Sequence, residues 1–308
     1  MAVIETRALT KRYPRVTALD ALDVSVGDGV TGLVGANGAG KSTLIKILLG
    51  LLPPTSGSAS VLGHDVVSEG AAVRAQVGYM PEHDCLPADV SANDLTVHLG
   101  QLSGLPYPAA RERAADVLRH VGLAEERYRP MGGYSTGMKQ RAKLAQALVH
   151  DPRLVLLDEP TNGLDPASRD EMLALVRRIG TEFGIAVLVT SHLLGELERV
   201  SDHVVVLDSG SLLRSSATSA FLDATGTLLV EVQGRADADR ALGQALVDRG
   251  LTARPGGERL VEVEVGDRSA DDVRDLVVAT TTDLGLGLVR LQERHHRIED
   301  VFREGLDV

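Results

Sequence analysis

The sequence is poor in aromatic residues and in cysteine, and it has no long apolar run. Only 3% of its 308 residues are aromatic, tryptophan is absent, and Cys85 is the single cysteine. One thiol excludes an intrachain disulfide and a thiolate metal cluster, and it fits a reducing compartment. The most apolar stretch, Leu44–Leu52, contains Lys46 and has about half of the ~20 residues that a membrane-spanning helix needs. We therefore expect a chain that does not itself cross a membrane.

Basic residues are also scarce relative to acidic ones. The chain has 32 Lys and Arg against 43 Asp and Glu, and its formal net charge is −11. A nucleic-acid binder normally needs a basic face that neutralises phosphates, so this charge argues against that class. The first residues include Glu5, Arg7 and Lys11 without an apolar segment, so we expect no secretory signal and a cytoplasmic chain. The length suggests about two domains.

A glycine-rich stretch predicts a phosphate-binding loop between a strand at Val30–Val34 and a helix at Thr43–Leu52. Its glycines let consecutive backbone NH groups turn toward an anion, and its lysine adds a full positive charge. The serine that follows can ligate a Mg²⁺ ion bridging the outer phosphates, and the helix directs its positive end at the same point. A glycine-rich turn without a ligand is the alternative, and the motifs downstream argue against it. The expected nucleotide contacts are Gly35, Ala36, Asn37, Gly38, Ala39, Gly40, Lys41, Ser42 and Thr43.

Two adjacent acids follow the all-apolar stretch Leu154–Leu157, which we predict to be a buried strand. Burying Asp158 and Glu159 at the end of a strand is costly unless a cation or a reaction requires them. Asp158 suits the coordination shell of Mg²⁺, directly or through water. Glu159 suits orienting an attacking water or taking its proton. The alternative is a pair of solvated surface acids.

Four further side chains are candidates for the same site. Tyr13, in the connection between two short predicted strands, Ile4–Arg7 and Leu22–Val26, can stack on a purine base. Val16 could pack beside it, and a strand-edge tyrosine is the alternative. Glu82 and His192 each follow a predicted buried strand. Glu82 either contacts Mg²⁺ or its waters or is a solvated loop charge, and the sequence leaves both open. His192 can make a polar contact to a γ-phosphate.

A helical insert is predicted over residues 87–150, and it contains a second candidate phosphate site at Ser135, Thr136 and Gly137. Ser135 can cap a helix N-terminus and Gly137 leaves room for an anion beside exposed NH groups. Without its neighbours this pattern would be an ordinary helix cap.

In their order along the chain, these motifs resemble an ATP-binding-cassette (ABC) ATPase over residues 1 to about 220. The resemblance implies ATP and Mg²⁺ as ligands and a head-to-tail homodimer in which each copy contributes half of each nucleotide site. It implies these roles: adenine stacking for Tyr13, the signature motif for Ser135 to Gly137, the catalytic carboxylate for Glu159, a partner-facing loop for Asp165 and the switch histidine for His192.

Two departures from the family pattern narrow the resemblance. The usual signature is Leu-Ser-Gly-Gly-Gln, and here Tyr134, Thr136 and Met138 differ from it, while Ser135 and Gly137 remain. The glutamine of the loop that faces the membrane partner is matched by Glu82, which puts its Mg²⁺ contact in doubt. With both departures the chain resembles the single-cassette ATPases of bacterial exporters for drugs, polysaccharides, lipids or ions.

The tail from residue 227 to residue 308 alternates as strand, helix, strand, strand, helix, strand, an order that suggests a small ferredoxin-like layer. A last predicted helix at Ile298–Phe302 resembles the ending of the same exporter ATPases, in which the appended domain packs on its twin or modulates activity. A passive stabilising domain is the alternative. The expected fold is thus an α/β P-loop core at 1–222 and an α+β domain at 227–308.

The resemblance implies hydrolysis of ATP to ADP and phosphate, coupled to transport through a separate membrane permease at the cytoplasmic face. Two other functions are alternatives. A soluble ABC ATPase acting on nucleic acid or the ribosome usually has two fused cassettes, coiled-coil inserts, zinc cysteines or basic linkers, and the sequence has none of these. A GTPase or small-molecule kinase would lack the signature motif and His192. Nothing in the sequence identifies the transported substrate.

Overall fold

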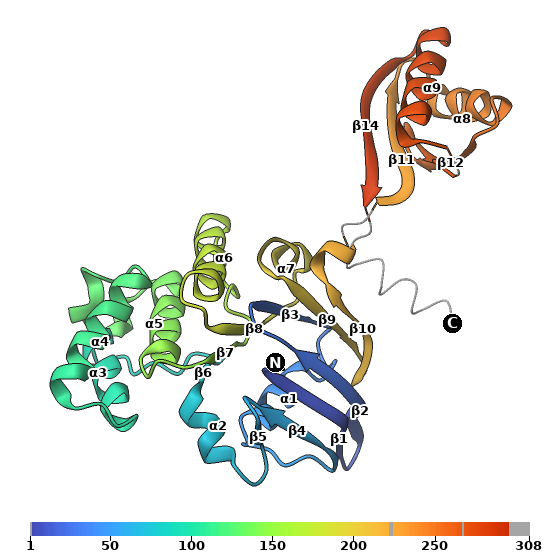
Figure 1. Cartoon of the computed structure of the whole chain (residues 1–308). Helices are drawn as coiled ribbons and strands as arrows, with labels where there is room; N and C mark the ends of the chain where they lie inside the picture. Colours follow the sequence, from blue (N-terminus) through green and yellow to red (C-terminus); the bar gives the residue numbers. More distant parts are fainter. Residues whose placement is uncertain (1, 222–223, 267, 296–308) are drawn as a thin grey trace. The chain divides into compact units, whose positions relative to one another are not determined.

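The chain divides into two compact units in the computed structural model, which describes residues 2–221, 224–266 and 268–295 (Figure 1). The first unit extends to Thr218 and the second begins at Ser219.

A mostly parallel sheet of six strands forms the centre of the first unit. In spatial order its strands are β10 (Ser211–Ala217), β9 (His203–Asp208), β3 (Val30–Val34), β8 (Ala186–Ser191), β7 (Leu154–Leu157) and β6 (Val77–Met80). All neighbours are parallel except β10 and β9. Strands β3, β7 and β8 are buried along their whole length, as expected for a parallel sheet covered on both faces. The carboxyl ends of β3, β6, β7 and β8 share one edge, where ligands of such sheets bind.

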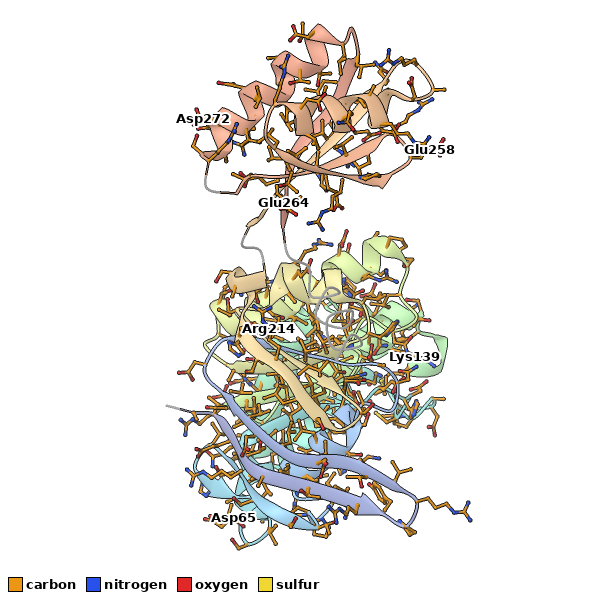
Figure 2. The ribbon with its side chains drawn as sticks, turned by 90° about the vertical axis from the view of Figure 1, so that its right-hand side faces the viewer. Asp65, Lys139, Arg214, Glu258, Glu264 and Asp272 are labelled. Atoms are coloured by element: carbon orange, nitrogen blue, oxygen red, sulfur yellow. The ribbon has the colours of Figure 1, made fainter. Side chains whose placement is uncertain are left out.

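A second, antiparallel sheet contains the N-terminal hairpin. Its strands in spatial order are β2 (Val16–Val26), β1 (Ile4–Tyr13), β4 (Ser56–Val61) and β5 (His64–Asp65), with Asp65 labelled in Figure 2. The hairpin is longer than the two predicted short strands, because Tyr13 is a strand residue paired with Val16. Strand β1 pairs with β2 on one side and β4 on the other. These ladder hydrogen bonds keep a polar segment extended where no alternation of apolar residues predicts a strand.

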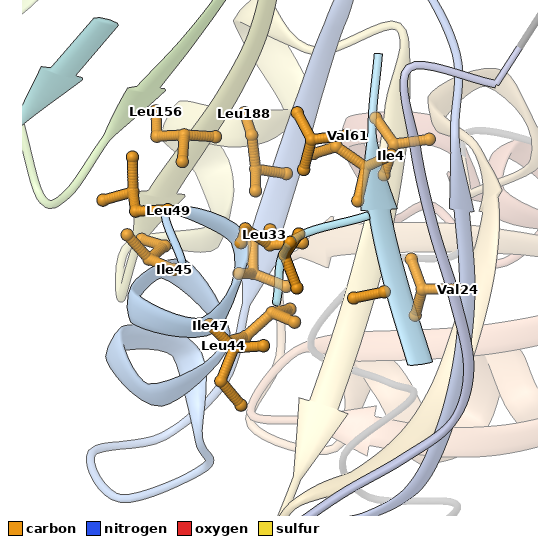
Figure 3. Close-up of a cluster of buried hydrophobic side chains, with 14 of the residues drawn as sticks. Ile4, Val24, Leu33, Leu44, Ile45, Ile47, Leu49, Val61, Leu156 and Leu188 are labelled. Carbon is orange, nitrogen blue, oxygen red and sulfur yellow. The ribbon is translucent and has the colours of Figure 1, made fainter. Parts of the chain in front are cut away.

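The main core lies between the two sheets and around helix α1 (Lys41–Leu48), as Figure 3 shows. Apolar side chains of α1 such as Ile45 meet Leu33 of the parallel sheet and Val61 of the antiparallel sheet in one buried cluster. Each fully buried side chain of this size is worth about 1.5–3 kcal/mol. Helix α1 begins and ends earlier than the predicted Thr43–Leu52, since Gly50 adopts a left-handed conformation (φ 65°) that stops it.

The remaining helices of the first unit cover the parallel sheet or form the predicted helical insert. They are α2 (Gly70–Gln76), α3 (Ala92–Leu102), α4 (Tyr107–His120), α5 (Thr136–Leu148), α6 (Pro166–Thr181) and α7 (Leu194–Val200), with short 3-10 turns η1 (Glu126–Tyr128) and η2 (Met131–Gly133). Helices α3, α4 and α5 lie between β6 and β7 in the chain, and Val97, Ala110 and Ala114 pack between α3 and α4. Within the described residues, every helix is too short or too polar to cross a membrane.

The second unit has its own small core. Its elements are η3 (Thr218–Phe221), which leads into it, β11 (Ala224–Gln233), α8 (Ala238–Asp248), β12 (Thr252–Gly257), β13 (Leu260–Glu264), α9 (Ala270–Asp283) and β14 (Gly287–His295). The sheet order is β12-β13-β11-β14 with antiparallel neighbours, which confirms the predicted ferredoxin-like order. Leu228 and Val263 of the sheet pack against Leu242 of α8 and Val277 of α9. The predicted helix at Ile298–Phe302 lies outside the described residues.

Candidate nucleotide site

A polar cavity of about 410 Å³ lies at the carboxyl edge of the parallel sheet. Its lining residues come from the loops after β3, β6, β7 and β8, from the start of helix α1 and from one residue of β2. They are Ala18, Ala36, Asn37, Gly38, Ala39, Gly40, Lys41, Ser42, Thr43, Glu82, Asp158, Glu159, Asn162 and His192. The fold therefore brings most of the predicted phosphate-loop, acid and histidine positions into one space.

Two glycines of the predicted phosphate loop are required by close backbone approaches. Gly40 has a φ of 102°, and a Cβ there would lie 2.4 Å from the carbonyl oxygen of Ala18. A Cβ on Gly35 would lie 2.7 Å from the carbonyl oxygen of Leu207. Gly35 itself is outside the lining of the cavity, so its role is to let the loop pass over the sheet. The loop shape thus depends on residues without side chains.

The buried Lys41 sits at the centre of this loop. Its Nζ donates to the carbonyl oxygens of Gly35 at 2.6 Å and Ala36 at 3.4 Å. Lysine is the first residue of α1, so its charge lies where the free NH groups of the helix N-terminus also gather. The arrangement offers an anion a cation and several NH donors in one place.

Glu159 has a strained backbone at the end of β7. Its φ is 51°, the left-handed region, which costs a residue other than glycine about 1–3 kcal/mol. The hydroxyl of Thr190 accepts from the Glu159 NH at 2.8 Å and donates to Asp158 Oδ1 at 2.9 Å. Thr190, on the neighbouring strand β8, therefore sets the position of both acids.

The Asp158 carboxyl is almost fully buried and its environment favours the neutral form. Burial raises the pKa of Asp158 above its ordinary value; the Thr190 hydrogen bond and Lys41 oppose this, and the charges of Glu82 and Glu159 add to it. A divalent cation would relieve the excess of negative charge. The Ser42 hydroxyl and the Asp158 carboxylate are hard oxygen donors in the same cavity, and Mg²⁺ is typically held by one or two such groups together with substrate phosphates. These residues fit Mg²⁺.

His192 is hydrogen-bonded to the second acid. Its Nδ1 lies 2.8 Å from Glu159 Oε2, and its side chain is half exposed whereas that of Glu159 is 9% exposed. An ionised carboxylate only accepts, so Nδ1 carries the proton in this contact. The histidine thereby orients the Glu159 carboxylate within the cavity.

Two residues that contribute to the site, Asn162 and Thr190, are not among the site residues predicted from the sequence. Asn162 lines the cavity and its side-chain amide donates to Glu82 Oε1 at 3.3 Å. Thr190 is fully buried and bridges the two acids. A polar residue at the end of the apolar run Ala186–Val189 was a usable signal for Thr190. No local sequence signal indicates Asn162, because its hydrogen-bond partner Glu82 lies 80 positions away in the chain.

The remaining predicted contacts lie outside the cavity lining. Tyr13 and Val16 face each other at the tip of the β1–β2 hairpin, where both are exposed, and Lys11 Nζ lies 5.5 Å from the centroid of the Tyr13 ring. An exposed ring at this tip can receive a planar base, although Tyr13 is not among the residues that line the cavity.

Ser135, Thr136, Gly137 and Asp165 form a separate group, in which Gly137 is half-buried and the other three residues are exposed. Ser135 caps α5 and accepts from the Met138 NH at 3.3 Å, while Asp165 caps α6 and accepts from the Ser168 NH at 3.0 Å. A Cβ on Gly137 would lie 3.6 Å from Ser168 Oγ, so the two helix N-termini are neighbours. Among the described residues of one chain, this group is not part of the lining of the phosphate-loop cavity.

The chain matches the ABC transporter family over residues 19–162. The daunorubicin/doxorubicin resistance ATP-binding protein DrrA of Streptomyces peucetius is 37% identical to it over 249 residues, 79% of this chain and 75% of that protein. The bacitracin transport ATP-binding protein BcrA of Bacillus licheniformis is 37% identical over 212 residues, 68% of each chain. The solved structure of cbiO1 from Clostridium perfringens, part of the ABC transporter complex cbiONQ, superimposes with a TM-score of 0.65 at 26% identity, covering 71% of this chain and 89% of that chain. The chain therefore belongs to the ABC transporter family, as a subunit that binds and hydrolyses ATP to drive transport.

Proposed function

We propose that this chain is the motor subunit of an exporter, in which two copies close around ATP and open again after hydrolysis. One observation carries the proposal: a single cavity combines the Lys41 loop with the buried Asp158 and with Glu159, whose carboxylate is bonded to His192. Phosphoryl transfer to water requires groups that position the reactants and stabilise charge, with little covalent chemistry by the protein. The residues of this cavity can supply both effects.

The roles of the residues follow from their positions. Lys41 and the NH groups of the loop bind the outer phosphates and offset charge on the transferring phosphoryl group. Glu159, aligned by His192, orients the attacking water and accepts its proton. Ser42 and Asp158 would hold Mg²⁺, which supplies further neutralisation of the phosphates when bound. Glu82 is the remaining carboxylate of the cavity, and its bond from Asn162 directs it there.

A single chain offers the phosphates only one side of a site. The group formed by Ser135, Thr136, Gly137 and Asp165 is at least partly exposed and lies outside the cavity lining. A second copy, placed head to tail, would bring its signature group to the open side of the first copy's cavity. ATP would then favour the closed pair, because it binds that state more tightly than the open one. Tyr13 and Val16 would contact the base.

Mixing two inactive variants tests this shared site. Lys41→Ala removes the loop charge, and Gly137→Asp places a carboxylate against the phosphates of the partner's site. The fold has room for the second change, because a Cβ on Gly137 meets Ser168 Oγ only at 3.6 Å. Each variant alone should hydrolyse almost no ATP. A mixed dimer regains one intact site, so an equal mixture should recover about a quarter of the wild-type rate.

The matched control is Gly27→Asp, at a position with open space around a Cβ. It should hydrolyse ATP at close to the wild-type rate. A mixture no more active than the sum of its separate components, or a Gly137→Asp variant as active as wild type, would contradict a site shared between subunits.

Export is supported by relatives named for resistance to daunorubicin and doxorubicin and for bacitracin transport. We propose that a separate polytopic permease contacts the helices α3 to α5 and the loop of Glu82, which places the subunit at the cytoplasmic face of the membrane. Closure of the dimer would press on the permease through this region.

Purification of the tagged chain from gently solubilised membranes of its own cells tests the partner. We expect a polytopic membrane protein to be recovered with it, and mass spectrometry identifies that protein. Recovery with ribosomes or DNA instead would support the other candidate, a soluble ABC ATPase that acts on nucleic acid or the ribosome.

A further inference from the structure

Helix α5 carries a buried lysine, Lys143, beside the loop that follows β6. The Lys143 side chain is 3% exposed, and its Nζ donates to the carbonyl oxygens of Pro81 at 2.7 Å, Glu82 at 2.9 Å and His83 at 3.4 Å. An ammonium group has three donors, and here three successive carbonyls take them. Lys143 therefore fixes the backbone of the loop from which Glu82 enters the cavity.

Burying the charged ammonium group of Lys143 costs free energy, and the acidic groups nearby offset only part of this cost. Burial lowers the pKa of Lys143 from its ordinary value, while acidic groups nearby, including Asp84 and Glu82, act in the opposite direction. Lys139, one turn earlier on α5 and labelled in Figure 2, also reaches the loop, with its Nζ 2.8 Å from Asp84 Oδ2. The side chains of the Lys139–Asp84 ion pair are partly exposed to solvent, whereas Lys143 is buried.

A series of hydrogen bonds runs from α5 to the loop of Glu82, from there to Asn162, and back to α5. Lys143 joins α5 to the backbone of Glu82, the Glu82 side chain accepts from Asn162, and the Asn162 carbonyl accepts from Gln140 of α5 at 3.0 Å. Glu82 and Asn162 both line the cavity. The N-terminus of the same helix carries Ser135 and Gly137, so one rigid element connects this cavity to the surface proposed to meet the partner's ATP.

We propose that Lys143 is a positioning residue that fixes Glu82 against the nucleotide cavity and so ties turnover to the placement of the signature helix. The inference rests on the proposed function of the cavity. It differs from a purely structural role, in which Lys143 would only hold the insert on the core and its loss would be independent of Glu82.

A double-mutant cycle between Lys143 and Glu82 separates the two roles. Lys143→Met keeps the length of the side chain and removes all three donors. We expect kcat to fall by about tenfold, because small misplacements in an active site have effects of this order or larger. ATP affinity of the separate subunit, measured by titration calorimetry, should stay within about threefold, since Lys41 and its loop are untouched. In a Glu82→Ala background the same change should have almost no further effect on kcat.

The matched control is Lys139→Met, which cuts a neighbouring link between the same helix and loop and should leave kcat within about twofold. Lys143→Arg is the milder second variant, because a planar guanidinium cannot serve three successive carbonyls in the same way. It should show a smaller loss of kcat that also vanishes with Glu82→Ala, and it replaces Lys143→Met if that variant does not fold.

The inference would be overturned if the loss of kcat in each double variant equalled the product of the losses in its two single variants. It would also be overturned if Glu82→Ala left kcat unchanged. Either result would leave the roles of Lys41 and Glu159 intact. A wild-type protein with no ATPase activity would instead refute the proposed function of the cavity itself, so the two failures are distinguishable.

Discussion

Glu159→Gln should retain ATP binding while its hydrolysis rate falls by about 10²-fold or more, the usual worth of a positioned base. Glutamine has the same shape and its side-chain oxygen can still accept from His192 Nδ1, but it carries no charge and cannot take a proton from water. The closed dimer should therefore accumulate in the presence of ATP. Phosphate release gives the rate, and size-exclusion chromatography with and without ATP gives the state of association.

Glu112→Gln is the matched control, an exposed glutamate on α4 away from the cavity. Its ATPase rate and its elution should equal those of wild type. If Glu159→Gln hydrolysed ATP within a few-fold of the wild-type rate, Glu159 would lose its assigned role and another group would have to activate the water.

Lys41→Ala should weaken ATP binding itself, by about 10²-fold, which corresponds to about 3 kcal/mol. We expect its ammonium group to make charge-assisted hydrogen bonds to the phosphate oxygens, and Lys41 is the only lysine or arginine among the residues lining the cavity. In the protein without nucleotide, the change also removes the donor to the Gly35 carbonyl. Isothermal titration calorimetry with ATP measures the loss directly.

Lys46→Ala provides the comparison, since Lys46 lies on the same helix and is exposed. It should bind ATP with wild-type affinity. Equal affinities for Lys41→Ala and wild type would count against the phosphate-binding role of the loop from Gly35 to Thr43.

The parts of the site that the sequence predicted are those in which the chemistry is local. The phosphate loop is one contiguous stretch, and its glycines and lysine have few other uses between a strand and a helix. Asp158 and Glu159 follow a fully apolar strand, where burying two acids calls for a ligand or a reaction. The resemblance to ABC ATPases implied the P-loop core, and the alternation of strands and helices in the tail indicated a ferredoxin-like unit.

The parts that the sequence did not predict depend on contacts between distant positions. Thr190 bridges Asp158 and Glu159 from a strand 31 and 32 positions further on. The bond between Asn162 and Glu82 spans 80 positions, and the three carbonyl contacts of Lys143 span about 60. The β1–β2 hairpin was predicted too short because ladder pairing, not local alternation, keeps it extended.

Within the residues that the structure describes, each unit has a hydrophobic cluster of its own. Leu33 and Ile45 belong to the cluster of the first unit, and Leu228 and Val277 belong to that of the second. A recombination event near residue 219 would exchange the tail while keeping the residues of the first cluster, such as Leu33 and Ile45, in one segment of the chain. For protein engineering, the same junction is a position at which a sensor or a regulatory domain can be fused to the ATP-binding unit.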